Sequence, residues 1–276
     1  MGSAPVTLGL VRIARFVHPG SAAVPSGVAW GVVEGALDAP LDALTVAAID
    51  GHPFAAITFT GERWAVPDVR LLSPILPSKV VAVGRNYADH AREMGGEAPA
   101  TPVIFLKPST SVIGTGDAIR LPHDSNRVDH EAELAVVIGR PARDVAAADA
   151  MQHVLGYTVG NDVSARDQQK ADVQFTRAKG HDSFCPIGPW IETALDPRDL
   201  RVTASVNGEL RQDGRTGEMI HDVPTLIAFM SSVMTLLPGD VILTGTPAGV
   251  GPITDGDTVT IEIEGIGELT NPVRLK

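Results

Sequence analysis

The chain has 276 residues, of which 44% are hydrophobic, and this provides enough length and apolar content for a packed core. Its formal net charge of −11 argues against nucleic acid or an anionic membrane surface as a partner, because neither attracts an acidic protein. No stretch approaches the ~18 apolar residues of a membrane span and the single cysteine excludes an internal disulfide, so we expect a soluble, cytoplasmic protein.

The first part of the chain has the pattern of a small β-rich domain. Residues 7–66 read as short strands separated by turn signals such as Pro25-Ser-Gly27 and Asp50-Gly51. A proline-bearing connection then leads into the apolar run Lys79-Val-Val-Ala-Val-Gly84. We therefore predict a small N-terminal domain over residues 1–75 and a larger domain over residues 76–276.

Strands outnumber helices in the larger domain. Strands are predicted near residues 79–83, 103–106, 131–138, 156–160, 202–206, 241–244 and 258–264, and Asn207-Gly208 predicts a hairpin turn because both its central positions favour positive φ. Helices are predicted at 224–236, with Asp222 as the capping residue, and near 88–94, 145–153 and 164–173. The two kinds of element do not alternate regularly, which favours a mixed α+β fold over a Rossmann-like sheet.

Two carboxylates, Glu131 and Glu133, lie one residue apart in the run from His130 to Gly139, and Asp162 follows further along the chain. Side chains at i and i+2 of a strand point to one side, roughly 6.5 Å apart along the backbone, so the two glutamates repel each other unless a cation neutralises them. The alternative is an ordinary charged strand face exposed to solvent.

The ligand chemistry narrows the choice of ion. Three carboxylates without cysteine suit Mg²⁺, Mn²⁺ or Ca²⁺ better than zinc, and we expect Mg²⁺. An octahedral ion held by three protein oxygens keeps about three positions for water or a chelating substrate, which indicates catalysis. His130 points to the other side of the strand, so we expect it either to pack in the core or to support the ligand residues from behind.

Two further clusters fit a catalytic site. His90 and Glu93 share a face of a predicted helix, so the carboxylate could orient the imidazole for proton transfer, although such a pair is common on solvated helices. Arg166 and Gln169 share a helical face after Asp162, and Lys179 could place a positive charge beside the ion. We expect Cys185 to be a small buried residue rather than a nucleophile.

Six segments together carry a family resemblance. They are Gly84-Arg-Asn-Tyr-Ala-Asp-His90, Phe105-Leu-Lys-Pro-Ser109, His130-Glu-Ala-Glu133, Gly160-Asn-Asp-Val-Ser-Ala-Arg-Asp167, Arg177-Ala-Lys-Gly180 and Leu243-Thr-Gly-Thr-Pro-Ala-Gly-Val250. In this order and spacing they resemble the fumarylacetoacetate hydrolase family over about residues 79–273. The resemblance implies a mixed β-sandwich roll behind a variable N-terminal domain, and a homodimer.

The resemblance also implies roles for individual residues. Mg²⁺ or Mn²⁺ would be bound by Glu131, Glu133 and Asp162. The dyad of His90 and Glu93 would lie on a mobile lid, with Lys179 at the oxyanion. The substrate pocket would be lined by Arg85, Tyr87, Lys107, Arg166, Gln169 and Thr246.

The implied substrates are 2-oxo or 2-hydroxy-dienoic acids and dicarboxylates, which chelate the ion and react through an enolate that the ion stabilises. The chain is similar to short bacterial members named 2-hydroxyhepta-2,4-diene-1,7-dioate isomerases, which act in aromatic compound catabolism. Carbon–carbon bond hydrolysis, acylpyruvate hydrolysis and oxaloacetate decarboxylation are alternatives, because the motifs do not separate these reactions. Two non-enzymatic alternatives are an oxo-acid-binding protein without turnover and a structural protein that holds Ca²⁺.

Overall fold

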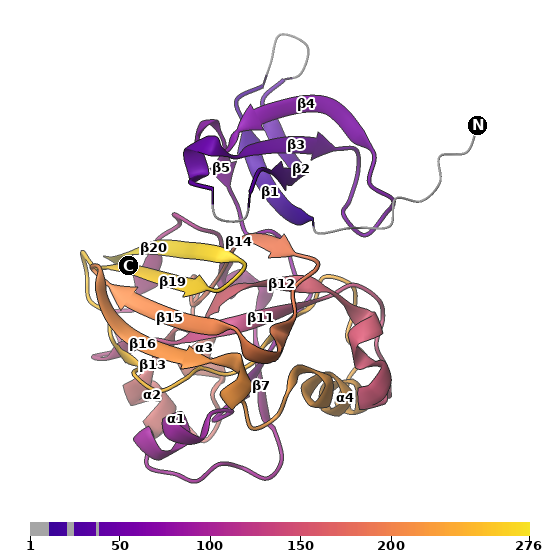
Figure 1. Cartoon of the computed structure of the whole chain (residues 1–276). Coiled ribbons are helices and arrows are strands. Elements are labelled where there is room, and N and C mark those ends of the chain that lie inside the picture. The colour runs from indigo at the N-terminus through magenta and orange to yellow at the C-terminus, as the bar shows by residue number, and fades with distance from the viewer. Residues whose placement is uncertain (1–10, 21–24, 37–38) are drawn as a thin grey trace.

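The computed structural model describes residues 11–20, 25–36 and 39–276. The N-terminal strands form one group at the top of Figure 1, and they are β1 (Arg12–His18), β2 (Gly27–Glu34), β3 (Thr45–Ile49), β4 (Phe59–Ala65) and β5 (Arg70–Leu71). β1 pairs antiparallel with β14 (Cys185–Glu192), which belongs to the larger part of the chain. One sheet therefore crosses the boundary predicted at residue 75, and the division into two domains stays a prediction.

The large sheet has the strand order β4-β3-β2-β1-β14-β12-β11-β17-β6-β7. Its strands from the larger part are β6 (Val80–Gly84), β7 (Val103–Lys107), β11 (Ala132–Ile138), β12 (Val154–Asn161), β14 and β17 (Val241–Leu243). β5 pairs with β1, and β8 (Val112–Ile113) pairs with β14. Every residue of β11 is buried, because Leu134 and Val136 enter one apolar cluster while Ala135 and Val137 enter another.

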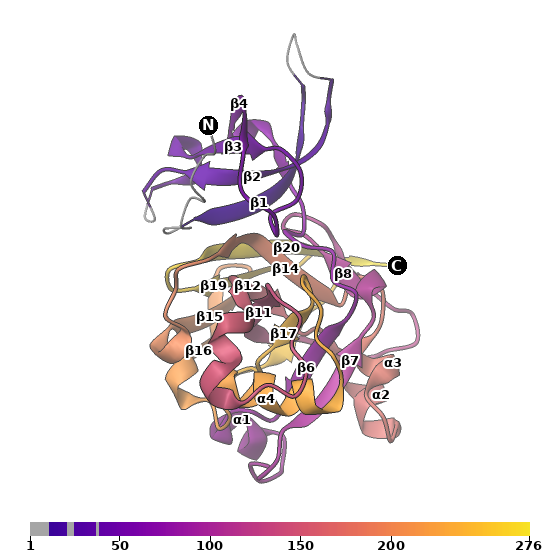
Figure 2. The same ribbon diagram turned by 90° about the vertical axis from the view of Figure 1, so that its right-hand side faces the viewer.

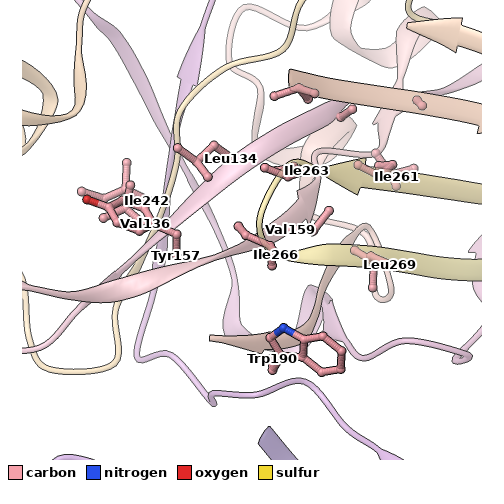
Figure 3. Close-up of a cluster of buried hydrophobic side chains, with 14 of the residues drawn as sticks. Leu134, Val136, Tyr157, Val159, Trp190, Ile242, Ile261, Ile263, Ile266 and Leu269 are labelled. Carbon is pink, nitrogen blue, oxygen red and sulfur yellow. The ribbon is translucent and has the colours of Figure 1, made fainter. Parts of the chain in front are cut away.

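A second sheet packs on β11 and β12 and completes a sandwich. Its strands, in order, are β16 (Glu209–Arg215), β15 (Arg201–Val206), β19 (Thr258–Ile263), β20 (Gly267–Leu275) and β9 (Ile119–Leu121). Figure 3 shows Leu134 and Val159 facing Ile263 and Ile266 in the core between the two sheets. A short third sheet joins β13 (Ser164–Ala165), β10 (Val128–His130) and β18 (Gly251–Pro252). This strand-rich architecture confirms the predicted mixed α+β roll.

Helices are short and lie around the sandwich. They are α1 (Ala88–Glu93), α2 (Arg166–Ala171), α3 (Thr176–Lys179) and α4 (Val223–Val233). α4 begins as predicted, since the Asp222 side chain accepts a hydrogen bond from Thr225 N at 2.9 Å, but it ends three residues early. Figure 2 shows α4 on the side of the molecule remote from the N-terminal strands. In the part of the chain that the structure describes, no helix has the length and apolar character that a bilayer crossing requires.

Short 3₁₀ helices occupy residues 41–43, 66–68, 109–111, 147–153, 197–199 and 216–218. The helix predicted at 145–153 is therefore 3₁₀ rather than α-helical. The hairpin prediction at Asn207-Gly208 is confirmed, with φ of 53° and 81° at the two positions between β15 and β16.

The strand predicted over residues 131–138 was wrong at its first residue. β10 ends at His130 and β11 begins at Ala132, so Glu131 lies in a break between them. The break arises because Glu131 N donates to the Asn161 side chain and Glu131 O accepts from Asp162 N, both at 3.0 Å. These bonds replace a ladder between strands and bring Glu131 beside the end of β12.

Candidate active site

Glu131, Glu133 and Asp162 come together at the ends of β11 and β12. Each offers one carboxylate oxygen, these oxygens all lie within 4.8 Å of one another, and the three side chains are buried. Pairing of Ala132 with Asn161 in the two antiparallel strands explains the convergence, because Asp162 then follows directly beside Glu131. The convergence predicted from sequence is therefore present despite the break at Glu131.

Two lysines contact this carboxylate trio. Lys179 Nζ, at the end of α3, donates to Glu131 Oε2 at 2.8 Å and to Asp162 Oδ2 at 2.5 Å. Lys107 Nζ, at the end of β7, donates to Asp162 Oδ1 at 2.5 Å. Both lysines are buried, and burial alone would lower the pKa of Lys179, yet Asp162 and Glu131 raise it overall. Lys179 is therefore a permanent positive charge in the site.

Arg166 connects the trio to a fourth carboxylate, Asp129. Its Nη2 lies 2.6 Å from Glu131 Oε1, its Nε donates to Asp129 Oδ2 at 2.9 Å, and its Nη1 donates to Gln169 at 2.9 Å. Asp129 also accepts two hydrogen bonds from Arg127, at 3.0 and 3.1 Å. Two guanidinium groups thus share one buried carboxylate at the edge of the trio.

Glu133 has no basic partner within ion-pair distance in the described part of the chain. Its Oε2 accepts a hydrogen bond from Gly245 N at 2.7 Å, and its burial together with Asp162 and Glu131 raises its pKa well above the ordinary value. In Glu131, by contrast, burial alone would raise the pKa, but Lys179 and Arg166 lower it overall. A buried, unpaired carboxylate beside two others fits a divalent cation, and the all-oxygen donor set fits Mg²⁺ or Mn²⁺.

His90 and Glu93 form the expected pair on α1. Their Nδ1 and Oε2 atoms lie 3.3 Å apart, and the Glu93 carboxylate also accepts from Gly249 N at 3.2 Å. Gly249 has φ of +97°, and a Cβ there would lie 2.2 Å from Arg211 O, so this position requires glycine. His90 is buried and close enough to Glu131 to lower the pKa of that carboxyl. The pair therefore belongs to the same site as the carboxylate trio.

A cavity of about 660 Å³ opens onto these groups. Its wall includes most of the residues predicted for the site, namely Arg85, His90, Glu93, Glu131, Glu133, Arg166, Gln169, Lys179 and Thr246. Asp162, Tyr87 and Lys107 are absent from the lining. Tyr87 is buried and burial raises its pKa, while Lys107 lies fully buried against Asp162. The structure thus places Tyr87 and Lys107 behind the wall rather than on it.

Several residues of the site were not predicted from the sequence, among them Arg127, Asp129 and Gln212. Arg127 and Asp129 line the cavity, and Gln212 on β16 is fully buried and bonded to Ala132 N and to the Thr246 side chain. Asp129 carried a signal, since it extends the alternation of Glu131 and Glu133 by two residues. No sequence pattern pointed to Gln212, because it lies on β16 in another sheet.

Cys185 is fully buried in β14, and burial raises the pKa of its thiol to about 12. A thiol with so high a pKa is not a nucleophile at neutral pH. The prediction of a small buried residue is confirmed.

Comparison with known proteins identifies the family. Residues 79–274 match the family described as Fumarylacetoacetate (FAA) hydrolase C-terminal, and residues 11–74 match the one described as Rv2993c-like, N-terminal. The chain belongs to the fumarylacetoacetate hydrolase family. Protein Rv2993c of Mycobacterium tuberculosis is 60% identical over 257 residues, which cover 92% of this chain and 97% of that family member.

Several related proteins, among both the solved structures and the curated relatives, are enzymes. A 2-hydroxyhepta-2,4-diene-1,7-dioate isomerase from Mycobacterium marinum superposes with a TM-score of 0.88 at 57% identity, covering 96% of this chain and 99% of that one. Oxaloacetate tautomerase fahd2 of Xenopus laevis is 44% identical over 75% of this chain and 69% of its own length. Fumarylpyruvate hydrolase from Pseudomonas aeruginosa, solved with Mn²⁺ and pyruvate, has a TM-score of 0.69 at 33% identity, covering 73% of this chain and 91% of that one. This chain is accordingly an enzyme of an isomerase, hydrolase or tautomerase type.

Proposed function

We propose that this enzyme is a Mg²⁺-dependent or Mn²⁺-dependent isomerase of 2-oxo and 2-hydroxy-dienoic acids, of the kind that interconverts 2-hydroxyhepta-2,4-diene-1,7-dioate and its 2-oxo isomer. The observation that carries the proposal is that the pair of His90 and Glu93 opens onto the same cavity as Glu131 and Glu133. An acid–base pair and two candidate metal ligands thus line one cavity, where a single substrate molecule could contact both. The related M. marinum isomerase and X. laevis tautomerase support the same class of proton transfer.

Glu131, Glu133 and Asp162 would hold the cation, and its chemistry would be to stabilise negative charge on the substrate's 2-oxygen. Lys179 keeps its ammonium beside Glu131 and Asp162, where it adds positive charge near that oxygen. Arg166 is held by Asp129 and Gln169 and presents its guanidinium at the cavity wall, where it can bind a substrate carboxylate.

His90 is the acid–base group of the proposed reaction. In the isomerisation the 2-hydroxyl loses its proton and a carbon further along the conjugated chain gains one, so no atom enters or leaves. His90 moves this proton, while Glu93 accepts the Nδ1 hydrogen and stabilises the charged imidazole. Gly249 N holds Glu93 in place. The apolar side chains Phe105 and Phe175 on the cavity wall restrict the access of water.

Hydrolysis of a carbon–carbon bond is the second candidate. The same His90 could take a proton from water, and the related fumarylpyruvate hydrolase was solved with Mn²⁺ and pyruvate. Decarboxylation of oxaloacetate is a further reaction that the same site could support, since it also requires stabilised charge on a 2-oxygen.

We also propose that the enzyme is a homodimer. Light scattering after gel filtration would measure the molar mass of the particle in solution.

The test is a substrate panel in D₂O with and without Mg²⁺. The panel is the heptadienedioate, the enol of oxaloacetate, acetylpyruvate and fumarylpyruvate, followed by ultraviolet absorbance and NMR. The isomerase proposal expects Mg²⁺-dependent conversion of the dienol with one deuterium incorporated at carbon. Release of pyruvate from an acylpyruvate would favour hydrolysis, and no reaction with any member would refute both.

The variant His90→Ala separates catalysis from binding. Removal of a general acid–base group lowers the rate by about 10²- to 10⁴-fold, while binding of oxalate to the Mg²⁺-loaded protein should remain. The matched control is His123→Ala, because His123 is exposed and lies outside the cavity lining. Unchanged turnover in His90→Ala would remove the dyad from the mechanism.

A further inference from the structure

The cavity is larger than the metal end of the substrate requires. A volume of about 660 Å³ lies within the range of sites for whole cofactors or drug-sized ligands, whereas the 2-oxo acid group that chelates a cation has only a few heavy atoms. The wall beyond Arg166, away from Glu131, is formed in part by Arg127 and Asp129. This part of the cavity has no role in the proton transfer described above.

Asp129 fixes Arg127 in this part of the cavity. Its side chain is 1% exposed, and its two oxygens accept from Arg127 Nε and Nη2 while Oδ2 also accepts from Arg166 Nε. The pair with Asp129 leaves Arg127 Nη1 free of that carboxylate, and 57% of the Arg127 side chain is exposed. A guanidinium held on one edge and open on the other is suited to bind a carboxylate.

The charge of the cavity points to the same ligand. Its lining has five basic side chains, Arg85, Arg127, Arg166, Lys170 and Lys179, and four acidic ones, Glu93, Asp129, Glu131 and Glu133. With His90 neutral the wall has one net positive charge, and a bound divalent cation raises this to three. The enolate of a 2-oxo monocarboxylate carries two negative charges, and that of a 2-oxo dicarboxylate carries three. Only the dicarboxylate neutralises the loaded cavity.

We propose that Arg127, oriented by Asp129, forms a second anion subsite that binds the distal carboxylate of a 2-oxo dicarboxylate and so selects dicarboxylates over monocarboxylates. The inference rests on the proposed function, because it assumes that the 2-oxo acid end lies at Glu131, Glu133 and Asp162. Arg127 is a specificity residue here, since the reacting atoms lie at the other end of the substrate.

The test uses two 2-oxo acids of equal length, 2-oxoglutarate and 2-oxopentanoate, which differ only in the distal carboxylate. Their dissociation constants with the Mg²⁺-loaded full-length protein are measured by calorimetry, with oxalate as a probe of the metal end alone. A partly exposed charge-assisted pair predicts that wild type prefers 2-oxoglutarate by about tenfold. In Arg127→Met the ratio of the two dissociation constants should fall towards one, while the affinity for oxalate stays within about twofold of wild type. Arg127→Lys, which keeps the charge and loses the fork, should retain part of the preference.

Arg201→Met is the matched control. Arg201 makes the same two-bond pair with a carboxylate, Asp213, at 2.8 Å, but it lies outside this cavity. The control should keep the wild-type preference. The subsite is refuted if Arg127→Met keeps the full preference, or if wild type binds oxalate and shows no preference for 2-oxoglutarate. A wild-type protein that binds neither oxalate nor either oxo acid would instead refute the proposed function.

Discussion

Glu133 is the residue on which the proposed metal site depends most directly. Glu131 and Asp162 are neutralised by Lys179, Lys107 and Arg166, whereas the described part of the chain offers Glu133 only the Gly245 amide. Burial and its two acidic neighbours raise the pKa of Glu133 well above that of an ordinary glutamate, so its ionised form is costly in the metal-free protein. A cation bound by the trio would favour the ionised form.

Glu133→Gln should therefore stabilise the metal-free protein and abolish its response to Mg²⁺. The amide keeps the shape of the side chain and removes the cost of a buried charge. We expect the metal-free Tm at pH 8 to rise by about 2–4 °C, as for a gain of one kcal/mol in a chain of this size. We expect Mg²⁺ to raise the Tm of the wild type, and this increase should be absent in the variant. Calorimetric scans with EDTA and with Mg²⁺ measure both effects.

The control for this substitution is Glu262→Gln on β19, where the side chain is exposed. It should leave the response to Mg²⁺ unchanged. A Glu133→Gln protein that Mg²⁺ still stabilises as strongly as wild type would exclude Glu133 as a ligand.

The pH dependence of metal binding follows from the same pKa. Between the ordinary pKa of glutamate and the raised pKa of Glu133, the folded metal-free protein holds a proton that the unfolded chain has lost. Its stability therefore falls as pH rises through this window. Mg²⁺ affinity should rise with pH over the same window, because bound Mg²⁺ requires the ionised carboxylate. Calorimetry in two buffers of different ionisation enthalpy should detect the released proton, and an affinity independent of pH from 5 to 8 would contradict this account.

At the scale of elements, the loop from Thr244 to Val250 connects the trio to α1. Gly245 N donates to Glu133, and Gly249 N donates to Glu93 on α1. Gln212 on β16 fastens this loop, because its Nε2 donates to Thr246 Oγ1 and to Pro247 O at 2.8 Å. The distance between Glu133 and the pair of His90 and Glu93 thus depends on the Gln212 side chain, which bonds to none of these residues.

Gln212 also holds the strand on the other side of the site. Its Oε1 accepts from Ala132 N at 3.0 Å and lies 3.1 Å from His130 Nδ1. Both amide hydrogens of Gln212 are used by Thr246 and Pro247, so His130 must donate from Nδ1, which defines its tautomer. The packing role predicted for His130 is consistent with this contact.

Gln212→Leu should weaken both the site and the fold. It leaves several buried polar groups without partners, at about 1–3 kcal/mol each before relaxation. We expect a lower Tm, and a Mg²⁺ dissociation constant raised about tenfold because Gly245 is no longer held against Glu133. Gln212→Glu keeps the acceptor for Ala132 N but loses the two hydrogen bonds donated to the loop. It should therefore bind Mg²⁺ more weakly than wild type. Titrations with Mg²⁺ at a temperature well below each Tm measure this.

Gln152→Leu is the control, because Gln152 is exposed and donates only locally to Asp149. It should match wild type in both measurements. If Gln212→Leu lowers Tm but binds Mg²⁺ with wild-type affinity, Gln212 supports the fold alone.

The sequence predicted those parts of the site that local spacing encodes. A spacing of two residues was sufficient to place Glu131 beside Glu133, although Glu131 lies in the break between β10 and β11. Helical spacing was sufficient to place Arg166 beside Gln169. The contact between Glu93 and Gly249 spans 156 positions and that between Gln212 and Ala132 spans 80, so no local pattern contains them.

The direction of a side chain and the presence of a strand were harder to predict than which residues lie close together. Lys107 and Tyr87 belong to the expected motifs, yet both side chains point behind the cavity wall, and a motif specifies residue types rather than the side from which they approach. β14 was not predicted, and it contains Pro186 and Pro189, a residue type that is rare inside a sheet. Pro186 pairs with Ile113 of the two-residue strand β8, and Pro189 lies where the pairing with β12 is irregular, between Gly188 and Glu192.

At the scale of the whole molecule, the N-terminal strands and the larger part share one sheet and one core. Ile13 on β1 pairs with Ile191 on β14, and both enter an apolar cluster that also contains Val137 and Leu243 of the strands behind the trio. This continuity predicts a single cooperative unfolding transition for the described chain, with equal calorimetric and van't Hoff enthalpies.

Ile13→Ala tests this coupling. Ile13 is fully buried, so the truncation should cost about 2–5 kcal/mol and lower the Tm of the one transition by several degrees. The rise in Tm that we expect on addition of Mg²⁺ should apply to this same transition, because the proposed metal ligands unfold in the same step. Val28→Ala on β2, where the side chain is 54% exposed, should change little. If Ile13→Ala instead splits the scan into two peaks, and the Mg²⁺-responsive peak keeps the wild-type Tm, the N-terminal strands unfold independently and the sheet that crosses residue 75 does not couple the two parts.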